Sequence, residues 1–97
     1  MIGVKEYNLF SHIGIITNMS VSLPQGGFIV DVFERYGNII AAVLCDDTRP
    51  YVIRQFHCVS AFYDLNLPPG KKYWHVGTVI DVTPPVVTRY YIIESEI

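Results

Sequence analysis

The most constraining feature of this sequence is that no stretch shows a convincing 3.6-residue apolar period. Short segments in which apolar and polar residues alternate are instead separated by turns that contain proline and glycine. These segments are rich in β-branched and aromatic residues, which favour strands. Because a period of two is typical of strands with one buried face, the chain is predicted to be all-β.

Seven strands are expected along the chain, over residues 2–9, 12–23, 28–36, 39–45, 51–60, 73–82 and 86–95. The clearest turn signals are the prolines and glycines of residues 23–27 and the pair Gly37-Asn38. Helix is expected only as a turn or two within residues 61–66. The predicted fold is a small single-domain barrel or sandwich of about six to seven mostly antiparallel strands, spanning residues 1–97.

Four local expectations sharpen this prediction. Residues 39–45 are apolar at every position, which predicts a central strand covered on both faces. Strict alternation over residues 28–36 places Phe28 and Val32 on the same face. A bulge is expected at Gly77, and Cys45 and Cys58 are expected to be free thiols in the core.

The composition is unusually apolar for so short a chain. Hydrophobic residues make up 51% and charged residues only 16%, against about 25% charged in a typical soluble domain. The shortage of charged surface residues predicts a homo-oligomer, in which a second copy covers part of the surface. The alternative is that the many tyrosines form the surface, with packed rings and solvated hydroxyls.

The charge pattern limits the classes of partner. The formal net charge is −2, and the seven basic residues are scattered, so no basic stripe is present for binding duplex nucleic acid. No apolar run approaches the ~18 residues of a membrane span, and the first ten residues lack the apolar region of a signal peptide. A cytoplasmic location is therefore expected, with no membrane partner.

The sequence does not predict an enzyme, a cofactor or a metal site. His57 and Cys58 are adjacent in a predicted strand, so they point to opposite faces and cannot bind one ion. Ser60, His57 and Asp64 have the residue types of a catalytic triad, but nothing in their spacing supports one. His57 is expected instead to pack beside Ile53 or Gln55.

Cationic and aromatic residues occur close together at several points. Aromatic rings stack on bases and arginine binds phosphate with two parallel hydrogen bonds, so such residues suit a small anionic ligand at a subunit interface. Tyrosine, tryptophan and arginine are equally typical of ordinary protein interfaces. The candidate ligand-binding residues are Arg54, Lys72, Trp74, Arg89 and Tyr91.

The order of motifs resembles a family of small all-β proteins of unknown function encoded by phages and prophages. The shared pattern is a Leu-Pro-x-Gly turn (residues 23–26), an apolar strand ending in Asp46, an Arg-x-Phe strand (54–56), a segment ending in Gly-Thr (73–78) and a C-terminal aromatic strand ending in Glu94. The resemblance covers about residues 4–95 and departs from the family at residues 59–67. It implies a phage origin and a fold, and no activity.

Two functions follow as expectations. The first is a non-catalytic phage accessory protein, a homo-oligomeric β module that binds and sequesters a nucleotide-like anion of host defence. The second is a structural or protein-binding module, either a virion component or an inhibitor of a host protein. The first requires converging cations, whereas the second requires an exposed apolar patch.

Overall fold

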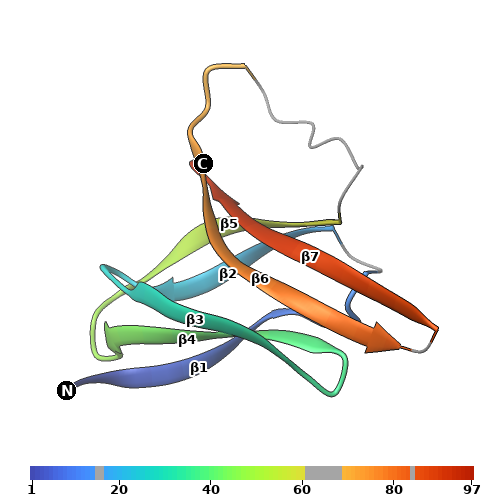
Figure 1. Cartoon of the computed structure of the whole chain (residues 1–97). Helices are drawn as coiled ribbons and strands as arrows, with labels where there is room; N and C mark the ends of the chain where they lie inside the picture. The colour runs from blue at the N-terminus through green and yellow to red at the C-terminus, as the bar shows by residue number, and fades with distance from the viewer. Residues whose placement is uncertain (15–16, 61–68, 84) are drawn as a thin grey trace.

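A computed structural model describes residues 1–14, 17–60, 69–83 and 85–97. These residues form seven strands and no helix, which confirms the predicted all-β fold (Figure 1). The strands are β1 (Ile2–Phe10), β2 (Asn18–Pro24), β3 (Phe28–Arg35), β4 (Asn38–Asp46), β5 (Tyr51–Ser60), β6 (Tyr73–Thr83) and β7 (Val86–Ser95).

The strands form two antiparallel sheets, with the orders β1–β4–β3 and β2–β5–β7–β6. The sheets pack face to face as a sandwich and do not close into a barrel. Edge strand β3 packs against edge strand β6. The Cα atoms span 44 × 34 × 17 Å, so the molecule is a thin slab with two broad outer faces.

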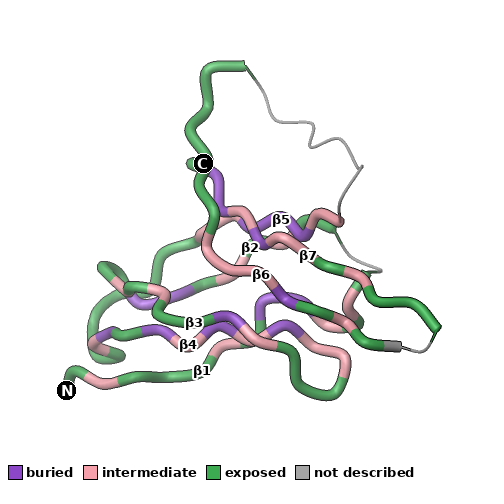
Figure 2. The backbone as a smooth tube through the Cα atoms, in the orientation of Figure 1, coloured by how far each residue is buried: buried purple, intermediate pink, exposed green. Residues whose placement is uncertain are grey.

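The core lies between the two sheets and is built by alternation along each strand. In β4, Ile39, Ala41, Val43 and Cys45 are buried, while the residues between them point to the other side (Figure 2). The opposite sheet contributes buried residues that include Leu23, Phe56, Cys58, Val79 and Ile92.

The two strands at the closest approach of the sheets each carry a bulge. The bulge predicted at Gly77 is present, with the register shift between His75 and Gly77. A Cβ atom at Gly77 would lie 2.6 Å from Val32 Cβ, so only glycine allows β6 to approach β3 this closely.

The second bulge overturns a prediction. Phe28 and Val32 do not share a face, because the register of β3 shifts between Ile29 and Asp31. Phe28 therefore lies opposite Leu44 and is exposed, whereas Val32 lies opposite Ala41 in the core. An extra residue inverts the alternation of everything that follows it.

Two further expectations need correction. Strand β4 is central in its sheet but is covered on one face only, since Leu44 on its other face is 41% exposed. The second strand begins at Asn18 rather than at residue 12, and His12 adopts a left-handed φ of 60°. The helix expected within residues 61–66 lies outside the described residues.

Candidate functional site

The predicted ligand residue Arg54 is held by a carboxylate of its own chain. Its Nε and Nη2 donate hydrogen bonds of 2.6 and 2.7 Å to the two oxygens of Glu94, and its Nη1 donates to the Gly27 carbonyl at 2.8 Å. The predicted ligand residue Trp74 donates from Nε1 to the same Glu94 carboxylate at 3.0 Å. Glu94 is buried on the inner side of its sheet, whereas Trp74 is 44% exposed, so this cluster lies at the margin of the space between the two sheets.

This cluster joins segments that are far apart in sequence. It brings together the glycine turn after β2, the Arg-x-Phe strand, the start of β6 and the end of β7, and the Arg54 guanidinium also lies 5.8 Å from the Phe56 ring. A buried carboxylate that accepts three hydrogen bonds is fully compensated within the chain. These motif residues therefore have a structural role, because their hydrogen bonds connect the turn after β2 with β5, β6 and β7.

The remaining three predicted ligand residues lie elsewhere. Lys72 directly precedes β6 and pairs through its backbone with Glu96. Arg89 lies opposite Ile80, near the β6–β7 turn. It is roughly 20 Å along the strand from Lys72. Tyr91 lies opposite Thr78, on the outer face. Only Arg54 and Trp74 of the five are brought together, and ligand binding by this set stays a prediction.

A polar network that the sequence did not predict crosses the outer face of the four-stranded sheet. Asn18 of β2 lies directly opposite His57 of β5, and its Oδ1 atom is 2.6 Å from His57 Nδ1. The Ser95 hydroxyl of β7 is 2.8 Å from His57 Nε2. His57 and Ser95 are buried, with 6% and 5% of their surface exposed.

The hydrogen bond to Asn18 assigns the tautomer of His57. An amide oxygen can only accept, so Nδ1 carries a proton, and in the neutral ring Nε2 accepts a hydrogen bond from the Ser95 hydroxyl. Burial lowers the pKa of His57 below its ordinary value of 6.5, because the charged imidazolium is poorly solvated there. The imidazole is therefore neutral near pH 7.

Further polar residues flank this network on the same face. Gln55 lies opposite both Ser20 and Ser95, and its Oε1 accepts a 2.7 Å hydrogen bond from the Ser20 hydroxyl. On the other side of Ser95, Tyr73 of β6 lies directly opposite it. One row across all four strands thus consists of Ser20, Gln55, Ser95 and Tyr73.

The outer face of the three-stranded sheet carries a row of exposed apolar side chains. One row across it consists of Val4, Leu44 and Phe28, with Ile2 next to Val4 on the same face. All four are exposed, by 58%, 41%, 67% and 73%. Beyond them the face carries a two-bond ion pair between Arg35 and Glu6, at 2.9 and 3.1 Å, which crosses β4.

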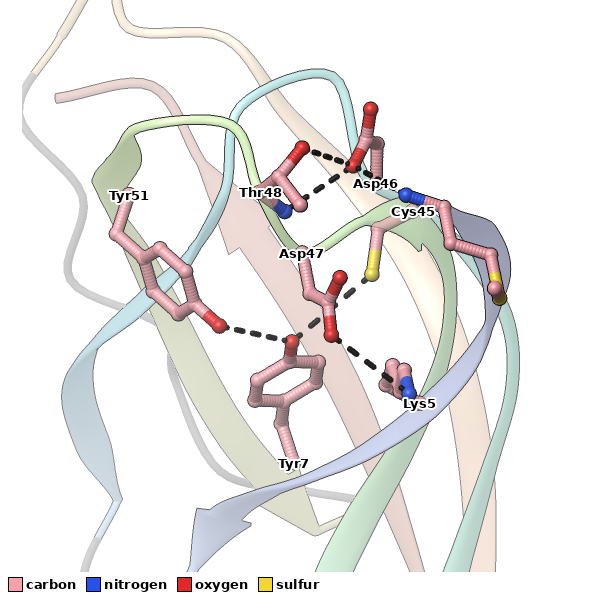
Figure 3. A network of polar contacts seen from close by, with 8 residues as sticks. Lys5, Tyr7, Cys45, Asp46, Asp47, Thr48 and Tyr51 are labelled. Atoms are coloured by element: carbon pink, nitrogen blue, oxygen red, sulfur yellow. Dashed lines mark hydrogen bonds and ion pairs between the residues drawn. The ribbon is translucent and has the colours of Figure 1, made fainter.

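A third network lies at the β4–β5 turn (Figure 3). Asp46 accepts hydrogen bonds from the hydroxyl and the backbone N–H of Thr48, at 2.6 and 3.1 Å, and pairs with the Met1 ammonium group. These contacts lower the pKa of Asp46 to about 2. The Tyr7 hydroxyl meets the Tyr51 hydroxyl at 3.3 Å and Cys45 Sγ at 3.9 Å. The hydrogen bond to Tyr51 and burial raise the pKa of Tyr7.

Both cysteines are free and buried, as predicted. Burial raises the pKa of the Cys58 thiol to about 11, so it is not an activated nucleophile. Within the described ranges, no three His, Cys, Asp or Glu side chains gather as a metal site would require. The same ranges contain no helix with the length and apolarity needed to cross a membrane.

Compared with protein-family models, with curated proteins and with solved structures, the chain matches none of them. The function must therefore be argued from the chain's own geometry. Both outer faces expose apolar side chains, which on the four-stranded sheet include Ile53, Ile80 and Val82, and the face of the four-stranded sheet also carries the ordered polar network around His57.

Proposed function

We propose that the chain is a self-associating protein-binding module, and that the outer face of β1–β4–β3 is its interface with a second copy. The observation that carries this proposal is the exposed row of Val4, Leu44 and Phe28, extended by Ile2. Monomeric proteins rarely leave contiguous apolar side chains of this size in water, and such patches mark interaction sites.

The charges on this face favour a copy of the same chain over an oppositely charged partner. Arg35 and Glu6 neutralise each other within one copy, so this pair does not require a complementary charge, and the face keeps the exposed carboxylate of Asp31, opposite Ala42. A flat apolar sheet can pack on its own symmetry mate at about 10 Å, as the sheets of β-sandwiches do. An isologous two-fold contact of this type is the commonest way to form a dimer.

Native mass spectrometry of the wild-type protein and of two matched variants tests the proposal. Phe28→Glu places a charge on the apolar row, and Val87→Glu places one at a similarly exposed position of the other sheet. We expect a wild-type dimer that Phe28→Glu weakens by about 2 kcal/mol or more, roughly 30-fold in Kd, and that Val87→Glu leaves unchanged. A wild-type monomer at every concentration, or equal effects of the two variants, would contradict the proposal.

The same spectra test the expectation that the protein sequesters a nucleotide-like anion. Since Lys72 and Arg89 lie far apart in one copy, such a ligand would bind between copies. An adduct of nucleotide mass that leaves on denaturation would support sequestration. An adduct-free dimer would favour the protein-binding function alone.

A further inference from the structure

We propose that Ser95, His57 and Asn18 form a nucleophile, general base and orienting group for hydrolysis of a small ester on the outer face of the four-stranded sheet. This activity is independent of self-association, because the two features lie on opposite outer faces of the sandwich. It also opposes the expectation from sequence that the chain is not an enzyme.

The first argument is the geometry of the hydrogen bonds. An activated serine requires a base within hydrogen-bond reach, and that base must be oriented by a third group through its other nitrogen. Ser95 Oγ is 2.8 Å from His57 Nε2, and Asn18 Oδ1 is 2.6 Å from His57 Nδ1. The two contacts use the two different ring nitrogens, in the arrangement that proton transfer from serine requires.

The second argument is the rigidity of the three side chains. They come from three adjacent strands, β2, β5 and β7, so the sheet register fixes their separations. Asn18 lies directly opposite His57, and Ser95 lies opposite Gln55, the outward-facing residue two positions before His57. Groups placed on strands hold their geometry more precisely than groups on loops. The neutral imidazole near pH 7 is the form that can accept the proton.

The third argument is a nearby hydrogen-bond donor. Gln55 lies directly opposite Ser95, and Ser20 occupies the amide oxygen of Gln55. The amide NH2 group is the remaining part of that side chain and consists of two donors. A side-chain amide beside a nucleophile can stabilise the oxyanion that forms on the attacked carbonyl.

The proposed reaction is an ordinary two-step hydrolysis with water as the second substrate. Ser95 Oγ bonds to the ester carbonyl carbon as its proton passes to His57 Nε2, and the bond to the leaving alkoxide breaks as that proton is transferred to it. Water then attacks the acyl-serine with His57 again as base, which releases the acid and restores the hydroxyl. Because Ser95 is 5% exposed, only small acyl groups are expected to react.

A small fluorophosphonate probe tests the proposal, with peptide mass spectrometry to locate the phosphonyl group. The serine oxygen–phosphorus bond forms, and fluoride leaves. We expect Ser95 to be labelled in the folded protein at least about tenfold faster than Ser22, an exposed serine on the same face. Ser95→Ala should remove this label and the hydrolysis of p-nitrophenyl acetate, and Ser22→Ala should remove neither.

The role of the base is tested with Asn18→Ala, because Asn18 is exposed and its loss leaves the buried core intact. We expect slower labelling of Ser95 with an unchanged circular dichroism spectrum, and His57→Gln should abolish labelling. Two results would overturn the proposal: labelling of Ser95 no faster than of Ser22, or labelling that is indifferent to Asn18→Ala and His57→Gln.

Discussion

The outer faces of the two sheets differ in how their polar side chains are arranged, while both expose apolar side chains, such as Phe28 on one and Val82 on the other. The face of β1–β4–β3 exposes a row of aliphatic and aromatic side chains, and its Arg35–Glu6 ion pair closes within one copy. On the face of β2–β5–β7–β6, polar side chains from three strands are hydrogen-bonded to one another, and two of them are buried. Among the described residues of these four strands, alternation places Asp81 and Glu94 inward and leaves this outer face without a carboxylate.

The two proposals assign different tasks to the two outer faces of one small sandwich. An apolar face contributes binding energy in proportion to the area it buries, and it makes few demands on geometry. A hydrogen-bonded network holds its side chains in a fixed geometry. Burial of an apolar surface does not require such a geometry. The shared core between the sheets allows either face to change without repacking the other.

The largest expected effect concerns the ion pair inside the sandwich. Arg54→Ala leaves the buried Glu94 carboxylate without its partner, so we expect a loss of about 3–5 kcal/mol in the free energy of unfolding. Arg35→Ala removes the corresponding partner of the exposed pair on the outer face of β1–β4–β3, and the expected loss is much smaller because solvent screens that pair. Urea unfolding followed by circular dichroism measures both, and equal losses would contradict this contrast.

The next effect tests the contact that joins the two sheets. Gly77→Ala forces a methyl group against Val32, and we expect a loss of about 1–3 kcal/mol. Val32→Ala in the same chain removes the two Cγ atoms that crowd this position but keeps Cβ, the nearest atom, so it should recover only part of that loss. A double-mutant cycle by urea unfolding measures the coupling, and strictly additive losses would show that β3 and β6 do not meet at this point.

Protonation of His57 should make the stability of the protein depend on pH. The unfolded chain has the ordinary His57 pKa near 6.5, and the folded chain has a lower one, so the unfolded state binds more protons as the pH falls through this range. Stability should therefore decrease from pH 7.5 to pH 5, and the decrease should be smaller in His57→Gln. The denaturation midpoint in urea at each pH measures this, and a slope unchanged by His57→Gln would contradict the burial of a neutral imidazole.

The smallest effect lies at the rim of the apolar face. Thr48→Val removes the shorter of the two hydrogen bonds that Thr48 donates to Asp46. The pKa of Asp46 should therefore rise from about 2 toward 3.8. The pKa of Asp46 is lower in the folded chain than in the unfolded chain. The contribution of Asp46 to stability is therefore present above pH 3.8 and is lost as the pH falls through 2. Carboxyl chemical shifts across this range by NMR report the change directly, and an unchanged pKa would remove Thr48 as its cause.

The strands, and therefore the fold class, could be predicted because alternation and turn residues are local signals. The bulge at Gly77 was predicted from a glycine within a strand pattern, but the bulge between Ile29 and Asp31 has no glycine to signal it. Strict alternation without that bulge predicts that Phe28 shares a face with Val32, whereas Phe28 lies on the opposite face. For the fully apolar stretch of β4, the sequence also does not indicate which face a second layer covers.

The candidate sites were less predictable because they depend on register between distant strands. Arg54 and Trp74 were singled out for their residue types, but their common partner Glu94 becomes visible only once β5, β6 and β7 are aligned. His57 was noted, yet its partners are 39 and 38 residues away in sequence. Asparagine and serine in strands are too common for such a pairing to be predicted from one sequence.

The central claim is that a second copy covers the outer face of β1–β4–β3 and leaves the outer face of β2–β5–β7–β6 uncovered. Carbene footprinting at low and at high protein concentration tests it directly, since the probe labels any solvent-exposed side chain. We predict that labelling of Val4, Phe28 and Leu44 falls as the concentration rises, while labelling of Val82 and Val87 on the other face stays constant. Labelling that is independent of concentration, or that falls only at Val82 and Val87, would contradict the account.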